Sequence, residues 1–312
     1  IKENDTFKAI VEQKDCDSEQ AKVREINSGI YWFKAEKLSG LLDKLGNNNA
    51  AGEYYLTDTV AVAEKKGVYT ADSTDVVLGA NSRSQLAALN EVARKRKLAE
   101  LMDEGVDIPL SDGIIIGKDV KIGHDTVILP NTIIKGKTVI GNGWEKGPNS
   151  YKADRGIEDN VILNNVQAHE SKVDSCAKAG PFVHLRPNTH LHSGVKIGDF
   201  VEVKNSEIGI NTCIAHLTYI GDSDVGKGVN FGCGCVTANY DGIKKYRTTI
   251  GDNAFIGCNT NMIAPVTIGD NATTAAGSTI TKNVPADSLA VERGQTRIIE
   301  HWEKNSKRIK KG

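Results

Sequence analysis

Aliphatic residues return at every sixth position along much of the second half of the chain, and this period restricts the fold more than any other feature. One unbroken series contains Ile250, Ile256, Met262, Ile268, Thr274 and Ile280. Other series begin at Ile116, Leu185 and Ile208. A helix repeats about every 3.6 residues and a half-buried strand about every 2, so neither gives this spacing. Hexapeptide repeats predict a parallel β-helix, in which each short strand points one aliphatic side chain into a shared core.

The charge balance and the cysteine content exclude several classes of protein. The 312 residues include 39 Lys and Arg against 40 Asp and Glu, so we expect neither nucleic acid nor a membrane surface as a partner. No apolar run is as long as a membrane span, and no signal peptide opens the chain. The 6 cysteines follow no regular framework, which is typical of reduced thiols in a cytoplasmic protein.

Residues 1–82 do not follow the hexad and show an α/β pattern instead. Residues 7–11 and 29–33 are predicted strands, and residues 35–45 and 56–64 are predicted helices. Because the chain begins in the middle of sequence of this ordinary globular kind, we expect an N-terminal part of this region to be missing.

A longer helix is predicted over residues 83–104, between the α/β region and the repeats. Ser82 and Gln85 have the spacing of a capping box at its start. The hexad domain is expected over residues 105–294, and a charged tail over residues 295–312.

The repeat is interrupted in two places. Its frame is weak between residues 143 and 174, where Trp144, Tyr151 and several charges intrude, but this stretch is still interpreted as coil. A polar stretch over residues 237–247 breaks the frame completely. Loops inserted in a regular scaffold are where function usually resides, so the second interruption is a candidate part of a site.

Two cations in the coil have a spacing that suggests a shared site. Arg186 and Lys204 are three hexads apart, so they stack on adjacent coils if three hexads make one turn. Such a pair suits a phosphate, because Arg offers a fork of donors and Lys a point charge. His216 lies two hexads further on, near Tyr219, and suits a general base. Lone cations are usually solvated and lone histidines usually structural, but the shared spacing and the neighbouring loop favour function.

Three further histidines, His184, His190 and His192, invite interpretation as metal ligands. One hexad corresponds to one face of such a coil, so His184 and His190 should point in directions about a third of a turn apart. We therefore favour structural roles over a metal site formed by one chain.

At these residues the sequence resembles the bifunctional N-acetylglucosamine-1-phosphate uridyltransferases/glucosamine-1-phosphate acetyltransferases. The matching segments of the repeat domain are residues 180–187, 201–205, 215–222, 230–232, 239–242, 263–266 and 275–277. The segments similar to the later part of the uridyltransferase domain are residues 10–12, 25–30, 47–50, 52–58 and 81–83. The resemblance covers nearly the whole chain, and the combination of motifs is highly specific.

The resemblance implies a left-handed parallel β-helix that forms a homotrimer, preceded by a partial α/β nucleotidyltransferase domain and a linker helix. It also implies transfer of the acetyl group of acetyl-CoA to the amine of glucosamine 1-phosphate, with His216 as general base. The product, N-acetylglucosamine 1-phosphate, would feed UDP-N-acetylglucosamine and peptidoglycan synthesis. Lys245 would reach in from a neighbouring chain. The residues implied to hold the sugar phosphate are Arg186, Lys204, Tyr219, Asn230 and Lys245.

Acetyl-CoA would lie along a second set of residues, with the active site between subunits. Asn239 would position the amine or His216. Cys258 stands where the family usually has Ser, and a thiol is the weaker hydrogen-bond donor, which weakens the case for a side-chain role in polarising the thioester. The positions implied to contact acetyl-CoA are Cys233, Asn239, Tyr240, Cys258, Ala276 and Arg293.

The uridyltransferase half of the resemblance is incomplete. Glu12 and Asn27 match residues that contact the UDP-sugar, and Asn81 matches a residue of the magnesium site. The glycine-rich nucleotide loop and the Asp that holds magnesium are absent from this chain. Half a site cannot organise phosphoryl transfer, so we predict no uridyltransferase activity and a need for Mg²⁺ only in the missing half.

Two other functions remain open. The first alternative is an acyltransferase for another acceptor, such as a different sugar nucleotide or an amino acid. The second is a non-catalytic module in which the coil drives trimerisation. The cation pair with Tyr219 and the Asn239 loop argues against the former. The intact set of Arg186, Lys204 and His216 argues against the latter, because a scaffold has no need of it.

Overall fold

The structure, a computed structural model, describes residues 1–3, 6–49, 51–154 and 156–300. Within them the chain divides into two compact units, Ile1–Ala93 and the part from Arg94 onward. Most of the tail expected over 295–312 lies outside the described residues. No described helix is both long enough and apolar enough to cross a membrane.

The first unit contains short helices and one small antiparallel hairpin. Helices α1 and α2 fall inside the ranges predicted as helical. The elements of this unit are β1 (Lys2–Glu3), β2 (Thr6–Phe7), η1 (Gln13–Asp15), η2 (Gln20–Lys22), α1 (Ala35–Leu42), α2 (Asp58–Val62) and η3 (Thr74–Val77).

The strands predicted over residues 7–11 and 29–33 are wrong beyond Phe7. Residues 29–33 form no described strand, and Trp32 is 98% exposed. A strand is stable only when its backbone groups bond to a neighbouring strand. No described strand pairs with residues 29–33, so the β-forming composition of this segment has no effect there.

Helix α3 (Arg83–Asp103) occupies the range expected for the linker helix. The backbone N–H of Gln85 donates to Oγ of Ser82 at 3.2 Å, as a capping box requires. The return bond forms one residue earlier than usual, because Asn81 N–H donates to Oε1 of Gln85 at 2.7 Å. The division between the units falls within this helix, so the domain boundaries at residues 82 and 104 stay predictions.

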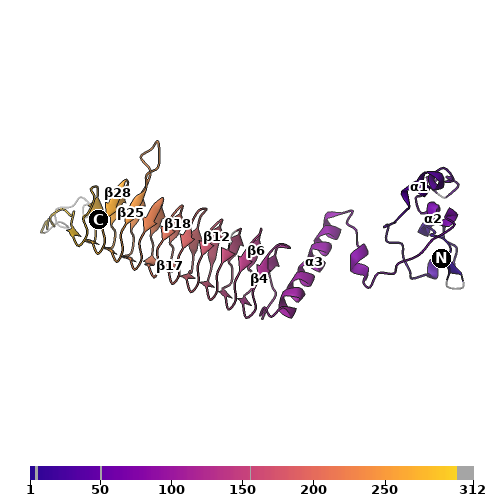
Figure 1. Ribbon diagram of the computed structural model, residues 1–312, viewed down its shortest axis with the longest axis horizontal. Helices are drawn as coiled ribbons and strands as arrows, with labels where there is room; N and C mark the ends of the chain where they lie inside the picture. Colours follow the sequence, from indigo (N-terminus) through magenta and orange to yellow (C-terminus); the bar gives the residue numbers. More distant parts are fainter. Residues whose placement is uncertain (4–5, 50, 155, 301–312) are drawn as a thin grey trace, which may run out of the picture. The chain divides into compact units, whose positions relative to one another are not determined.

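The second unit is a left-handed parallel β-helix, as expected (Figure 1). From β3 to β27 each strand pairs with the third strand after it, and β29 pairs with β31, so three parallel sheets run along the coil. The first sheet contains β3 (Ile115–Ile116), β6 (Ile133–Lys135), β9 (Tyr151–Ala153), β12 (Val166–His169), β15 (Val183–Leu185), β18 (Glu202–Lys204), β21 (Tyr219–Gly221), β24 (Val236–Ala238), β27 (Asn261–Ile263) and β30 (Thr279–Ile280).

The other two sheets complete each turn of the coil. The second sheet contains β4 (Lys121–Ile122), β7 (Val139–Ile140), β10 (Gly156–Ile157), β13 (Lys172–Val173), β16 (His190–Leu191), β19 (Glu207–Ile208), β22 (Ser223–Val225), β25 (Thr248–Ile250) and β28 (Val266–Ile268). The third sheet contains β5 (Val127–Ile128), β8 (Glu145–Lys146), β11 (Ile162–Leu163), β14 (Lys178–Ala179), β17 (Lys196–Asp199), β20 (Cys213–His216), β23 (Asn230–Phe231), β26 (Phe255–Ile256), β29 (Thr273–Thr274) and β31 (Leu289–Ala290).

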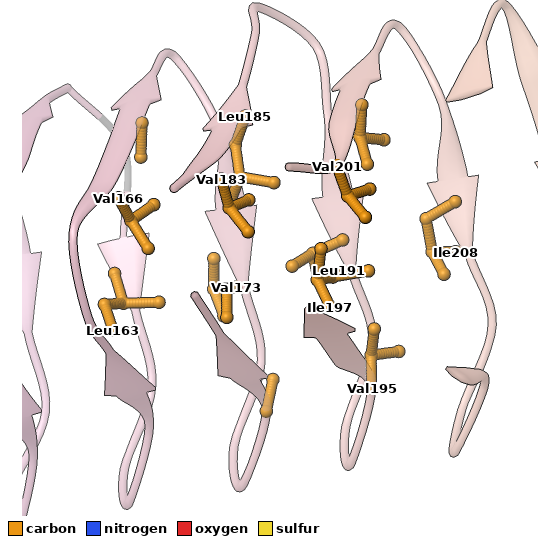
Figure 2. Close-up of a cluster of buried hydrophobic side chains, with 14 of the residues drawn as sticks. Leu163, Val166, Val173, Val183, Leu185, Leu191, Val195, Ile197, Val201 and Ile208 are labelled. Carbon is orange, nitrogen blue, oxygen red and sulfur yellow. The ribbon is translucent and has the colours of Figure 1, made fainter. Parts of the chain in front are cut away.

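The register explains the hexad period. Ile115 pairs with Ile133, and Lys121 pairs with Val139, so one turn of the coil takes three hexads. In most strands one aliphatic side chain points inward, and Figure 2 shows such side chains stacked inside the coil. Burying one such side chain stabilises the fold by roughly 1.5–3 kcal/mol. The buried side chains labelled there are Leu163, Val166, Val173, Val183, Leu185, Leu191, Val195, Ile197, Val201 and Ile208. The buried position is Lys152 in β9, Thr237 in β24 and Thr274 in β29.

The stretch with the weak hexad frame continues as coil, as predicted. Its turns are shorter than three hexads, since Tyr151 pairs with Gln167 and Ile162 pairs with Lys178. Trp144 is fully buried and belongs to the core cluster, so this aromatic side chain fills the coil interior instead of interrupting it.

We expect Trp144→Ala to lower the free energy of unfolding of the coil by about 3–5 kcal/mol, because it leaves a large cavity between rigid coils. Urea denaturation followed by circular dichroism measures the change. Trp32→Ala is the matched control, since Trp32 is 98% exposed and should cost little. Equal stability of the two variants would contradict the placement of Trp144 in the core.

The second interruption is a loop, also as predicted. Ser223 of β22 pairs with Thr248 of β25, so the turn between these two strands is longer than three hexads. The extra residues project from the coil between β24 and β25, and are drawn in orange in Figure 1. The sheets on both sides of the loop keep their register.

Candidate active site

Arg186 and Lys204 lie on adjacent coils of the first sheet, as their spacing predicts. Leu185 pairs with Val203, and the backbone N–H of Arg186 donates to the Val203 carbonyl at 2.8 Å. The guanidinium of Arg186 also donates to Oε1 of Glu202 at 2.7 Å, which holds it over the sheet.

Lys245, on the inserted loop, joins this pair within the same chain. The ammonium group of Lys245 lowers the pKa of Lys204, and desolvation and Arg186 lower it further, while Asp222 acts in the opposite direction. Three mutually repelling cations at one place leave a positive charge that a phosphate dianion would neutralise. The expectation that Lys245 comes from a neighbouring chain stays a prediction.

A buried carboxylate links the loop to the coil beneath these cations. Asp222 is only 7% exposed, and its two oxygens accept from the side-chain amides of Asn205 and Asn239. The backbone N–H of Asp222 donates to the Lys204 carbonyl at 3.0 Å. Sequence reasoning assigned no role to Asp222. The signal was its place in the sequence, one turn after Asn205 and one turn before Asn239.

Tyr219 and Asn239 meet over a glycine. A Cβ atom at Gly221 would lie 2.4 Å from the Tyr219 hydroxyl and 2.6 Å from Nδ2 of Asn239. Gly221 is in register with Lys204 on the adjacent coil. The absence of a side chain at Gly221 therefore lets the tyrosine hydroxyl and the amide approach the level of the lysine.

The loop is fixed at its tip and at its end. The backbone N–H groups of Lys244 and Ile243 both donate to Oδ1 of Asp241 at 2.8 Å and lower the pKa of that carboxyl. At the end of the loop, Arg247 forms two hydrogen bonds to the Asp224 carboxylate. The bonds hold the backbone around Lys245 in one conformation.

His216 stands in a column of residues that runs along the coil. It ends β20, and its side chain is exposed at the corner between the third and first sheets. The next coils place Cys233, then Cys258, then Ala276 at the same level. Backbone N–H groups of the following coil donate to the carbonyls of His216, Cys233 and Cys258 at 3.4, 2.8 and 2.7 Å. Residues implied to contact acetyl-CoA are therefore in line with the implied base.

Three other predicted site residues lie around these two groups. Arg293 is beside the end of the column, since its Cδ lies 3.9 Å from the position of a Cβ on Gly277. Tyr240 is exposed on the loop, and its hydroxyl donates to the Gly242 carbonyl at 2.6 Å. Asn230 pairs with Cys213 on the third sheet, so one chain does not bring it to the cations of the first sheet.

The thiols in and beside the column differ in their exposure to solvent. Cys258 is exposed and Cys233 is half-buried. Burial raises the pKa of Cys235 to about 11, so at pH 8 only about one in a thousand Cys235 side chains is a thiolate.

We expect iodoacetamide at pH 8 to modify Cys258 quickly and to leave Cys235 unmodified until the chain unfolds. Peptide mass mapping after brief exposure measures this order. Cys176, which is exposed elsewhere on the coil, is the internal control for reagent access. Modification of Cys235 at the rate of Cys258 in folded protein would contradict the burial described.

The chain is similar to known proteins over most of its length. The bacterial transferase hexapeptide family (six repeats) matches residues 247–282. The bifunctional protein GlmU of Desulfitobacterium hafniense strain Y51 is 44% identical over 312 residues, which are 99% of this chain and 69% of that protein. The chain belongs to the GlmU family. GlmU of Clostridium acetobutylicum is 47% identical over 300 residues, which are 95% of this chain and 66% of that protein.

The chain spans about two thirds of the length of these GlmU relatives. The resemblance inferred from its motifs is therefore confirmed at the level of the family. Among solved structures, the UDP-N-acetylglucosamine acyltransferase of Francisella novicida is 17% identical, with a TM-score of 0.36. That similarity covers 57% of this chain and 64% of the other.

In this GlmU-family chain, the residues matched to the uridyltransferase half are not seen to converge. Glu12 precedes η1, Asn27 donates to the Tyr31 hydroxyl at 2.6 Å, and the backbone N–H of Asn81 donates to the Gln85 side chain at the start of α3. Among the described residues, no hydrogen bond or common cavity joins the three. Their roles, and the role of magnesium, stay predictions.

Proposed function

We propose that this chain transfers the acetyl group of acetyl-CoA to the amine of glucosamine 1-phosphate. The observation that carries the proposal is the gathering of three cations on the sheet whose other edge bears His216. Arg186 and Lys204 lie at the ends of adjacent strands of the first sheet, Lys245 of the inserted loop joins them, and His216 lies at the corner where the next strand of that sheet begins. Three cations with a tyrosine hydroxyl suit a sugar phosphate, and an exposed imidazole suits proton removal from an amine.

In the proposed reaction, His216 accepts a proton from the acceptor amine as the nitrogen attacks the thioester carbonyl. The N–C bond forms, the C–S bond breaks, and the proton passes from the imidazolium to the departing CoA sulfur. Imidazole is the side chain best suited to take up and release a proton at neutral pH. Asn239, held by buried Asp222, would orient the amine.

Acetyl-CoA would lie along the column that contains Cys233, Cys258 and Ala276, with Arg293 at its end. Backbone hydrogen bonds align these residues on successive turns, and their small side chains leave room for an extended ligand. Both features support the assignment. We propose a cytoplasmic location, because all six cysteines are free and a reducing compartment keeps them so.

We also propose a homotrimer with active sites between subunits. An exposed apolar ridge made of Phe182, Phe200 and Leu217 borders His216 and supports this proposal. The two phenyl rings stack with centroids 5.3 Å apart, and the three residues are 57–59% exposed. All three have positive φ, a conformation that bulky residues seldom adopt, so packing against another copy would offset the strain. A neighbouring copy would also bring its Asn230 towards the cations.

The direct experiment mixes the purified chain with acetyl-CoA and glucosamine 1-phosphate, without UTP or added metal. Detection of the acetylated sugar phosphate by mass avoids background from the thiols of the chain. We expect product from this mixture and little from glucosamine. Absence of product from a well-folded trimer, as judged by sedimentation, would overturn the proposal. Equal turnover of glucosamine would point to another acceptor.

A further inference from the structure

Two histidines and two carboxylates meet on the second sheet, outside the proposed active site. His190 lies in β16 and pairs with Glu207 of β19 on the next coil. Asp174 directly follows β13 on the preceding coil, and His192 directly follows β16. The sequence-based preference for structural histidines considered His184 with His190. The structure places these two on different sheets and instead brings His192 beside His190, with ring centroids 3.9 Å apart.

Every ring nitrogen of the two histidines faces a carboxylate oxygen. For His190, Nε2 is 2.9 Å from Oδ1 of Asp174, and Nδ1 is 2.9 Å from Oε2 of Glu207. For His192, Nδ1 is 3.3 Å from Oδ2 of Asp174, and Nε2 is 3.1 Å from Oε2 of Glu207. The Asp174 side chain is only 12% exposed, so water cannot readily satisfy it.

The cluster has more hydrogen-bond acceptors than donors when both imidazoles are neutral. An ionised carboxylate only accepts hydrogen bonds, and a neutral imidazole donates from one nitrogen only. Two neutral rings can satisfy two of the four contacts. Lys172 Nζ lies 2.8 Å from Oδ1 of Asp174 and 3.4 Å from Nε2 of His190 and can donate to both, so at least one contact still opposes one lone pair to another. One doubly charged cation among these atoms removes the conflict, because it uses the lone pairs as ligands.

We propose that Asp174, His190, His192 and Glu207 bind one Zn²⁺ ion. One ligand atom from each of Asp174, His190 and His192 lies within 4.8 Å of the other two. In a tetrahedral zinc site such atoms are about 3.3 Å apart, so small side-chain rotations close the site. Two imidazoles with two carboxylates suit zinc better than magnesium or calcium, which prefer oxygen ligands throughout.

The surroundings allow an ion to enter. Lys172 lies 2.8 Å from Oδ1 of Asp174 and competes for it, but it is also 3.7 Å from Glu158 and can pair there instead. An open depression of about 370 Å³, lined in part by Lys172, His190 and Glu207, leads to the cluster. The bound ion would fasten three successive coils together and stabilise them by mass action.

The test uses the full chain, first stripped with a chelator and then titrated with Zn²⁺ at neutral pH. Calorimetry should show one ion per chain, and Zn²⁺ should raise Tm. His190→Asn and His192→Asn should each weaken binding by at least about 100-fold and abolish the rise in Tm, since each removes a ligand. Lys172→Met should strengthen binding, because it removes the competing cation.

Two controls keep the outcome specific. His169→Asn changes a histidine on the first sheet and should leave binding unchanged. Co²⁺ in place of Zn²⁺ should give a tetrahedral visible spectrum without the charge-transfer band of a thiolate. Absence of one-to-one binding, binding that survives His190→Asn, or binding lost in Cys233→Ser and Cys258→Ser would overturn the proposal. The proposal does not depend on acetyl transfer.

Discussion

Replacement of His216 with Ala should lower kcat for acetyl transfer by about 10²–10⁴-fold, the usual contribution of a positioned general base. The amine nitrogen must lose a proton as it attacks the thioester carbonyl, and His216 is the base that the proposal assigns to this step. The fold should persist, because the His216 side chain is exposed and contributes little to the core. Turnover measured by product mass and secondary structure measured by circular dichroism separate the two effects.

His124→Ala is the matched control for this variant. His124 is also exposed on the coil, with its side chain 64% exposed and in contact with Asp125. Its replacement should leave kcat unchanged. Full activity in the His216 variant would show that another group removes the proton, and the same loss in both variants would show general damage.

Arg186→Ala and Lys204→Ala should each lower kcat/KM for glucosamine 1-phosphate by roughly 30-fold to several thousand-fold, equivalent to about 2–5 kcal/mol for a truncated charge partner. The decrease in kcat/KM should result only from the lost contacts to the phosphate of the acceptor. Turnover of glucosamine, which lacks the phosphate, should therefore change little. The ratio of the two kcat/KM values reports the phosphate contact and cancels effects on His216.

Lys227→Ala provides the control for loss of charge. Lys227 belongs to the same β-helix, but its ammonium group pairs with Asp252 at 3.3 Å. We expect no change in the substrate ratio for this variant. If Arg186→Ala and Lys204→Ala lower turnover of glucosamine as much as that of the phosphate, the two cations support the fold instead of binding the acceptor.

The hexad period predicted the β-helix because each feature that sets the turns of the β-helix depends on residues close together in the sequence. One inward side chain per short strand and a small corner residue suffice to set a turn of three hexads, as the pairing of Ile115 with Ile133 shows. The segment at residues 29–33 failed for the opposite reason. Its side chains favour a strand, but a strand also requires a partner that no local pattern specifies.

Within the candidate site, spacing predicted Arg186 beside Lys204 because both follow the turn length. Asp222 escaped prediction, since its role depends on amides contributed by the coils before and after it. The His190 cluster was missed in the same way. Its carboxylates come from the turn before and the turn after the histidine. Only the actual register aligns them, since Lys172 pairs with His190 after a full three hexads whereas His190 pairs with Glu207 after a shorter turn.

The enlarged turn between β22 and β25 shows that the loop can change in sequence independently of the core. Ser223 and Val225 pair with Thr248 and Ile250 in unbroken register, although a whole loop is inserted between their coils. The hydrogen bonds between β22 and β25 therefore do not depend on the length or composition of the loop. Mutations there escape the constraint that the core imposes on every sixth residue. A scaffold of this kind can exchange the loop that carries Lys245 and acquire a new acceptor in evolution, while the coil around it stays fixed.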